Sequence, residues 1–143
     1  MCAAPWGLME SKIKHLELIQ GVINRLASNS FLIKGWSVGL VSALFALSAG
    51  NVNSAFVLIA YVPVLVFWGL DGYFLWQERL YRALYDRVRG LSESEVDFSM
   101  NVTTVRGQTP GWTSAVFSIT LAAFHGVLLI AVVIVMVILL SVH

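Results

Sequence analysis

Long apolar stretches dominate the chain, and short polar segments separate them. A membrane-spanning helix needs roughly 20 predominantly apolar residues. Three segments meet this requirement, and they run from Phe31 to Ala49, from Ala55 to Trp76 and from Thr113 to Val142. At about 1.5 Å per residue the third would reach about 45 Å. Because this exceeds a hydrocarbon core of about 30 Å, we expect the third helix to tilt or to project beyond the membrane.

Two more segments show a helical pattern outside the spans. Between Ser11 and Ala27, apolar residues recur every three or four positions, which predicts an amphipathic helix that lies on the membrane or packs on partners. The segment 77–89 has one apolar face and continues the helix of the second span. After Gly90 apolar and polar residues alternate over 96–103, which is typical of a short strand. Such a strand could pair with another chain by edge addition; the alternative is an extended loop over the helices.

The basic residues predict the orientation of the spans. All nine Lys and Arg residues fall within 12–34 and 79–106, and basic loops stay on the cytoplasmic side of a bacterial inner membrane. We therefore expect an all-α, three-span membrane protein with its N-terminus inside and its C-terminus outside. Residues 1–30 would form a cytoplasmic N-terminal segment with the amphipathic helix, and residues 31–76 a transmembrane hairpin. Residues 77–112 would form a cytoplasmic helix and loop, and residues 113–143 a third transmembrane helix.

Composition supports a lipid environment and excludes several classes of function. The chain is 58% hydrophobic and 12% charged, whereas soluble domains are about 45–50% apolar and about 25% charged. A net charge of +1 argues against a nucleic-acid partner. No phosphate-binding loop, zinc motif or hydrolase motif occurs. The three His residues fall at different predicted depths and cannot converge on one metal. We expect no enzymatic activity and no cofactor.

Asp71 and Lys34 are the charged residues inside predicted spans. Counted outward from the turn near Val52, Lys34 lies about 18 residues before it and Asp71 about 19 residues after it, so the two reach the same depth in an antiparallel hairpin. The sequence therefore predicts an intramembrane ion pair. Two alternatives stay open, namely that the side chains extend to the headgroups or that Asp71 serves ion or proton movement.

Polar residues follow one face of the third predicted helix. Ser114, Ser118 and His125 lie at helical spacing, and the same line continues beyond His125 with apolar residues. In an oligomer this face could line a wet vestibule that a hydrophobic constriction closes. Alternatively, the hydroxyls and the imidazole form hydrogen bonds to neighbouring helices within a bundle.

Small residues form a stripe along the first span. Gly35, Gly39, Ala43 and Ala46 recur at helical spacing and include a GxxxG motif. Small residues let two helices approach closely in a membrane. We expect the second span of the hairpin to pack on this stripe, and another subunit is the alternative.

Two stretches carry a resemblance to known proteins. They read HLELIQGVINRLASNSFLIKGWSVGLVSALFAL (15–47) and VFWGLDGYFLWQERLYRALYDRVR (66–89). Together they resemble a family of small bacterial inner-membrane proteins of uncharacterised function, which implies no site residues. The layout is also loosely similar to the multi-span membrane effectors of anti-phage defence, which oligomerise and breach the inner membrane.

Three functions follow as hypotheses. The first is a homo-oligomeric, channel-forming or membrane-perturbing effector of a bacterial defence or stress response. The second is a membrane anchor that recruits a soluble cytoplasmic protein through residues 77–112. The third is a small proton- or ion-coupled transporter subunit that depends on Asp71.

Overall fold

The computed structural model describes residues 5–51 and 54–142, and it is built almost entirely from helices. Three of them are long, and they are α1 (Pro5–Asn51), α2 (Ser54–Gly90) and α4 (Ile119–Val142). The short helices are η1 (Glu93–Glu95), η2 (Val102–Thr104), η3 (Arg106–Gln108) and α3 (Trp112–Val116). Helix accounts for 89% of the structure, and the described ranges contain no strand.

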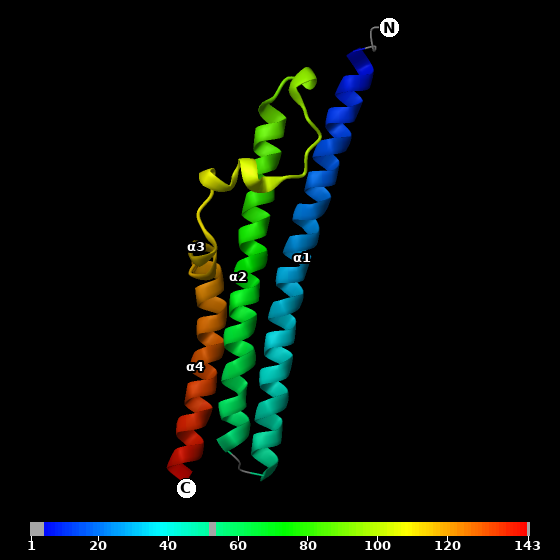
Figure 1. The fold of residues 1–143 in the computed structure, drawn as a ribbon. Coiled ribbons are helices and arrows are strands. Elements are labelled where there is room, and N and C mark those ends of the chain that lie inside the picture. The colour runs from blue at the N-terminus through cyan, green and yellow to red at the C-terminus, as the bar shows by residue number, and fades with distance from the viewer. Residues whose placement is uncertain (1–4, 52–53, 143) are drawn as a thin grey trace.

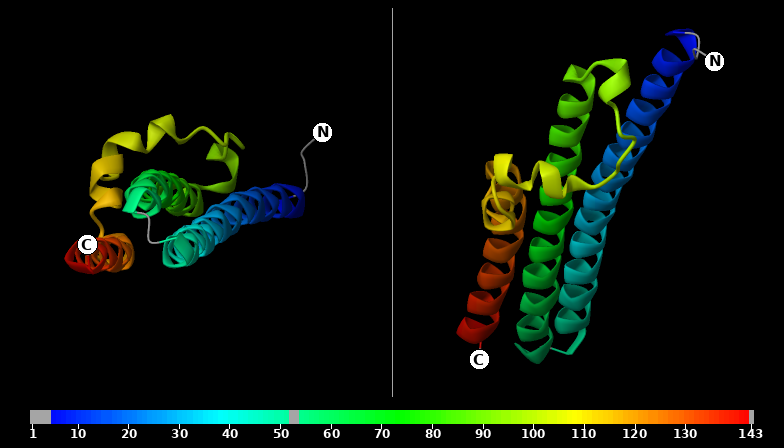
Figure 2. Two further views of the ribbon diagram at one scale, coloured as in Figure 1. Left: turned by 90° about the horizontal axis from the view of Figure 1, so that it is seen from below. Right: turned by 45° about the horizontal axis from the view of Figure 1, so that its top comes forward.

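Helix α2 packs against both α1 and α4 (Figures 1 and 2). Helix α2 runs antiparallel to both neighbours, so the C-terminal end of α4 lies at the same end of the molecule as the end of α1 and the start of α2 (Figure 1). The segments 12–25 and 79–106, which contain eight of the nine basic residues, belong to the opposite half of the molecule, whereas Lys34 lies nearer the C-terminal end of α1.

Three helices are long and apolar enough to cross a membrane, and they fall within Gly7–Ser48, Val57–Gly90 and Ile119–Leu139. Their outer faces carry large apolar side chains that the described residues leave uncovered. Phe31 is 77% exposed and Ile119 is 86% exposed. An apolar surface of this extent is stable against lipid rather than water.

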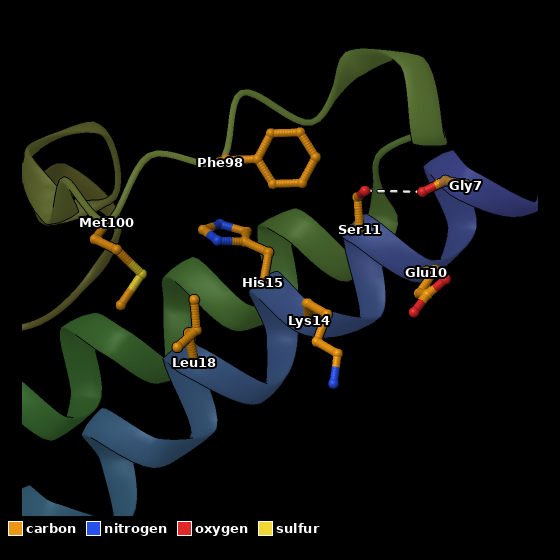
Figure 3. Close-up of a pocket in the computed structure, with 8 residues that line it drawn as sticks. All are labelled: Gly7, Glu10, Ser11, Lys14, His15, Leu18, Phe98 and Met100. Carbon is orange, nitrogen blue, oxygen red and sulfur yellow. Dashed lines mark hydrogen bonds between the residues drawn. The ribbon is translucent and has the colours of Figure 1, made fainter. Parts of the chain in front are cut away.

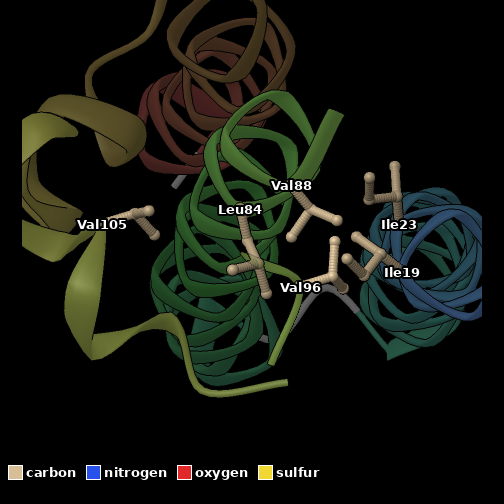
Figure 4. Packing of buried hydrophobic residues seen from close by; sticks show 6 residues of the cluster. All are labelled: Ile19, Ile23, Leu84, Val88, Val96 and Val105. Carbon is tan, nitrogen blue, oxygen red and sulfur yellow. The ribbon is translucent and has the colours of Figure 1, made fainter. Parts of the chain in front are cut away.

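Helix α1 runs without interruption across residue 30, where the cytoplasmic segment is expected to meet the first span. The amphipathic segment and the first span form one continuous helix of 47 residues, about 70 Å long. The N-terminal half does not lie apart from the rest of the chain, because Ile19 and Ile23 pack against Leu84 and Val88 of α2, together with Val96 (Figure 4). We call residues 7–29, 77–90 and 91–111 the helical extension.

The alternating segment 96–103 is not a strand. Its polar side chains accept hydrogen bonds from backbone N–H groups two residues ahead: Asp97 from Ser99, Ser99 from Asn101, and Asn101 from Thr103, at 3.0, 3.2 and 3.0 Å. Such local hydrogen bonds compete with a strand ladder. The period of two therefore reflects successive turns in an extended loop over the helices, which was the alternative interpretation.

The third predicted span is broken near its start. Helix α3 ends at Val116, Phe117 has φ −93° and ψ 18°, and α4 begins at Ile119. The 24 residues of α4 extend about 36 Å, close to the thickness of a hydrocarbon core of about 30 Å. The break, rather than a tilt or projection of one long helix, explains the excess length of the apolar segment.

Candidate functional site

A buried carboxylate lies where the three long helices meet. Asp71 of α2 has no exposed surface. Its Oδ2 atom lies 2.6 Å from Nζ of Lys34 on α1 and 3.0 Å from Nε2 of His125 on α4. Its Oδ1 atom accepts a hydrogen bond from the Ser30 hydroxyl of α1 at 2.5 Å. We call Ser30, Lys34, Asp71 and His125 the polar cluster.

Helix geometry positions the two contributions from α1. Ser30 and Lys34 are four residues apart and therefore lie on one face, one turn from each other. Lys34 Nζ donates to the Ser30 hydroxyl at 2.8 Å, and that hydroxyl in turn donates to Asp71. Lys34 Nζ also lies 5.9 Å from the ring centre of Phe124 on α4, a cation–π contact. The lysine thus contacts both other helices.

Aromatic rings surround the imidazole of His125, which has no exposed surface. The Trp68 ring stacks on it at 5.8 Å between centres and 11° between planes, and Phe124 meets it edge-on at 5.1 Å. An ionised carboxylate can only accept hydrogen bonds, so Nε2 of His125 carries a hydrogen and donates the hydrogen bond to Asp71. The buried Nδ1 atom has no hydrogen-bond partner among the described residues.

Two tryptophans form hydrogen bonds that join α3 to α2 and so position the start of α4. The Trp68 indole N–H donates to the Val116 carbonyl at 2.9 Å, and the Trp112 indole N–H donates to the Gly69 carbonyl at 3.2 Å. Val116 also packs directly on Gly72, which has no side chain to keep it away. These contacts hold the break in the third span beside Asp71, so that His125 reaches the carboxylate.

The cluster is electrically balanced, which makes its burial physically reasonable. A lone charge inside a membrane is costly, but an ammonium and a carboxylate in contact offset much of that cost when hydrogen bonds satisfy the remaining atoms. Groups of three or more His, Cys, Asp or Glu side chains suited to a metal do not occur among the described residues. The contacts of Asp71 therefore suit association of the three long helices.

The structure brings together part of what the sequence suggested. Lys34 and Asp71 meet at one depth, as the count from the turn gave. His125 was expected on a separate polar face, and its contact with Asp71 was missed. Nothing in the sequence indicated the break between α3 and α4, and this break sets the depth of His125. Counted from Ile119, His125 lies about 9 Å into the helix, close to the level of Asp71 rather than at the midplane.

The polar face of the third span is not continuous. Ser114 lies in α3 and is exposed, whereas Ser118 lies in the break and has a buried hydroxyl without a partner among the described residues. His125 turns its ring toward α2 and has no surface available to line a vestibule in this conformation. The interpretation in which polar groups bond to neighbouring helices describes His125.

The small-residue stripe of α1 faces away from α2, so the expectation that the second span packs on it is wrong. Gly35, Gly39, Ala43 and Ala46 are all exposed, and a Cβ atom added at either glycine would meet nothing within 4 Å. The face of α1 that packs on α2 instead carries Val41. The stripe is free to contact lipid or another chain.

Comparisons with protein-family models, with curated proteins and with solved structures found no match. The resemblance to small bacterial inner-membrane proteins therefore stays a prediction. A functional argument must start from the polar cluster and from the helices that carry it.

Proposed function

We propose that this chain is a multi-pass protein of the bacterial inner membrane that assembles into a homo-oligomer and permeabilises the membrane, and that the polar cluster holds its closed conformation. The observation that carries the proposal is the position of Asp71, which contacts α1 through Lys34 and α4 through His125. One carboxylate thereby connects all three long helices.

The physical link between this cluster and permeation is water. Any movement that separates α1 or α4 from α2 exposes Lys34 or Asp71 to its surroundings. In lipid that exposure is strongly unfavourable, whereas in a hydrated path it is not. Separation of the cluster is therefore coupled to entry of water between the helices, which is how a closed bundle becomes a conducting one.

Oligomerisation supplies the enclosure that one chain lacks. Buried side chains of all three long helices, among them Val41, Val64 and Val132, form one apolar cluster, so the described part of a single chain offers no water-filled path there. The exposed stripe of Gly35, Gly39, Ala43 and Ala46 supports close approach of a second copy, because small residues favour helix contacts in membranes. Such an assembly suits an effector that acts on the membrane during a defence or stress response.

The proposal is tested by following the membrane potential with a voltage-sensitive dye during graded expression in bacteria. We expect the wild-type chain to depolarise cells at high expression, and Asp71→Asn and Lys34→Gln to do so at clearly lower amounts of inserted protein. Asp86→Asn is the matched control, because Asp86 is exposed and lies 3.5 Å from Arg89 in the extension. It should behave as the wild type does.

Protein amounts in the membrane fraction are matched before the potentials are compared, so that failed insertion is not mistaken for a closed state. An intact potential at the highest expression of the wild type and of both cluster variants, all inserted equally, would contradict the proposal. Depolarisation that is equal for Asp71→Asn and Asp86→Asn would contradict the role of the cluster.

A further inference from the structure

The helical extension contains a cavity that the membrane role does not use. It lies between α1 and the loop after η1, and its volume is about 460 Å³. Figure 3 shows the residues that line it, among them Glu10, Lys14, His15, Leu18, Phe98 and Met100. Small-molecule sites commonly have volumes of about 300–1,000 Å³ and mostly apolar walls with a few polar groups.

His15 is the polar group at the base of this cavity. The residue is only 2% exposed, and its buried Nε2 atom has no hydrogen-bond partner among the described residues. The Phe98 ring meets the imidazole edge-on at 5.6 Å and covers it (Figure 3). A buried polar atom without a partner is unfavourable, so a ligand group that pairs with Nε2 would gain the hydrogen bond that the free protein lacks.

The residue that covers His15 is strained. Phe98 has φ 55°, a left-handed conformation that a bulky side chain rarely adopts. Strain of this kind persists only where surrounding contacts impose it, and it gathers at sites that change conformation. Phe98 is also 46% exposed as a whole residue. Its displacement by a ligand ring would open the path to Nε2 and let the backbone relax.

One cation is available at the rim. Lys14 lies 3.6 Å from Glu17, but both side chains are more than 60% exposed. Ion pairs on the surface contribute little to stability. Lys14 can therefore turn to an anionic group in the cavity. Glu10 on the same rim disfavours a multiply charged anion such as a phosphate and can accept a hydrogen bond from a ring N–H.

We propose that the cavity binds a flat aromatic carboxylic acid of the size of indole-3-carboxylate. The ring system lies in the cavity against Leu18 and Met100, and the Phe98 ring moves aside to give it access to His15. A polar ring atom or carboxylate oxygen pairs with Nε2 of His15, and the carboxylate contacts Lys14. The proposal does not depend on membrane permeation.

The test uses the full chain in lipid nanodiscs with isotope-labelled histidine, titrated with indole-3-carboxylate and followed by NMR. We expect a saturable shift of the His15 ring signals, while the signals of His125 stay in place. Leu18→Trp fills the cavity from the surface of α1 and should weaken binding by about tenfold or more. Ile13→Trp adds the same side chain to α1 outside this cavity and should bind as the wild type does.

Unchanged His125 signals in each variant show that the polar cluster is intact. Lys14→Gln should weaken the binding of indole-3-carboxylate and leave the binding of indole-3-carboxamide unchanged. The proposal is overturned if the His15 signals do not saturate, or if Leu18→Trp and Ile13→Trp bind equally. Equal affinity of wild type for the carboxylate and the carboxamide would overturn the assignment of an acid.

Discussion

At the scale of single residues, the molecule depends on how Asp71 is accommodated. A carboxylate without exposed surface would be unstable alone, and it is satisfied here by an ammonium, a hydroxyl and an imidazole. Each partner comes from a different turn or helix, so the cost of burying the charge is offset only when all three helices are in place. The carboxylate therefore makes the arrangement of the helices specific.

Gly72, the neighbour of Asp71, is expected to tolerate no side chain. A Cβ atom at this position would overlap Val116 Cγ2 and lie 3.0 Å from Val116 Cα. Gly72→Ala should therefore push α3 away from α2 and lower the free energy of unfolding by about 1–3 kcal/mol, measured by reversible unfolding in mixed detergent micelles.

Gly69→Ala is the control for this change. It adds the same methyl group to the same helix, where the nearest described atom is Trp112 Cζ2 at 3.9 Å, an ordinary contact. The effect of alanine on helix propensity is then equal in both variants. Equal free energies of unfolding for the two variants would show that α3 does not pack closely on Gly72.

At the scale of elements, the long helices were predictable and their interruptions were not. Apolar length alone identifies three helices, and counting residues from one tight turn places Lys34 level with Asp71. The break between Val116 and Ile119 depends on two indole hydrogen bonds from Trp68 and Trp112, which join segments far apart in the chain. Local periodicity does not contain such contacts, so the partner of His125 was missed.

The same limit applies to the alternating segment and to the small-residue stripe. A period of two predicts a strand, but the side chains of Asp97, Ser99 and Asn101 bond to their own backbone. A GxxxG motif predicts close packing without naming the partner, and in this chain Gly35 and Gly39 face outward. Which face of a helix is buried depends on the whole bundle.

The start of the loop in the extension gives a pH-dependent prediction. The Ser92 hydroxyl and backbone N–H both donate to the Glu95 carboxylate, at 2.6 and 3.0 Å, and hold the pKa of Glu95 below its ordinary value. The stabilisation of η1 is therefore present above the ordinary pKa and is lost as the pH falls through the lowered one. An NMR titration of the Glu95 carboxyl should show the low value.

Ser92→Ala removes the hydroxyl that contributes most to this shift. The pKa of Glu95 should then rise toward the value of an ordinary glutamate, while the backbone donor keeps part of the effect. An identical titration curve in the wild type and in Ser92→Ala would contradict the assigned cause.

At the scale of the whole molecule, the polar cluster lies between two regions of different character. Helix α1 is about 70 Å long, far longer than a hydrocarbon core of about 30 Å, so much of it belongs to the extension rather than to a span. One packed cluster of apolar residues joins α1 and α2 in the extension, and another joins the three long helices beyond Asp71. Two continuous helices, α1 and α2, therefore join the extension directly to the polar cluster.

The contact between Asp71 and His125 in a lipid bilayer is the most direct test of this account. Solid-state NMR on the full chain, with ¹³C-labelled aspartate and ¹⁵N-labelled histidine, reports whether Asp71 Cγ and His125 Nε2 are close. We predict a correlation between them, since Oδ2 and Nε2 are 3.0 Å apart, and we predict that it survives in Asp86→Asn. Resolved signals from both residues without that correlation would contradict the account.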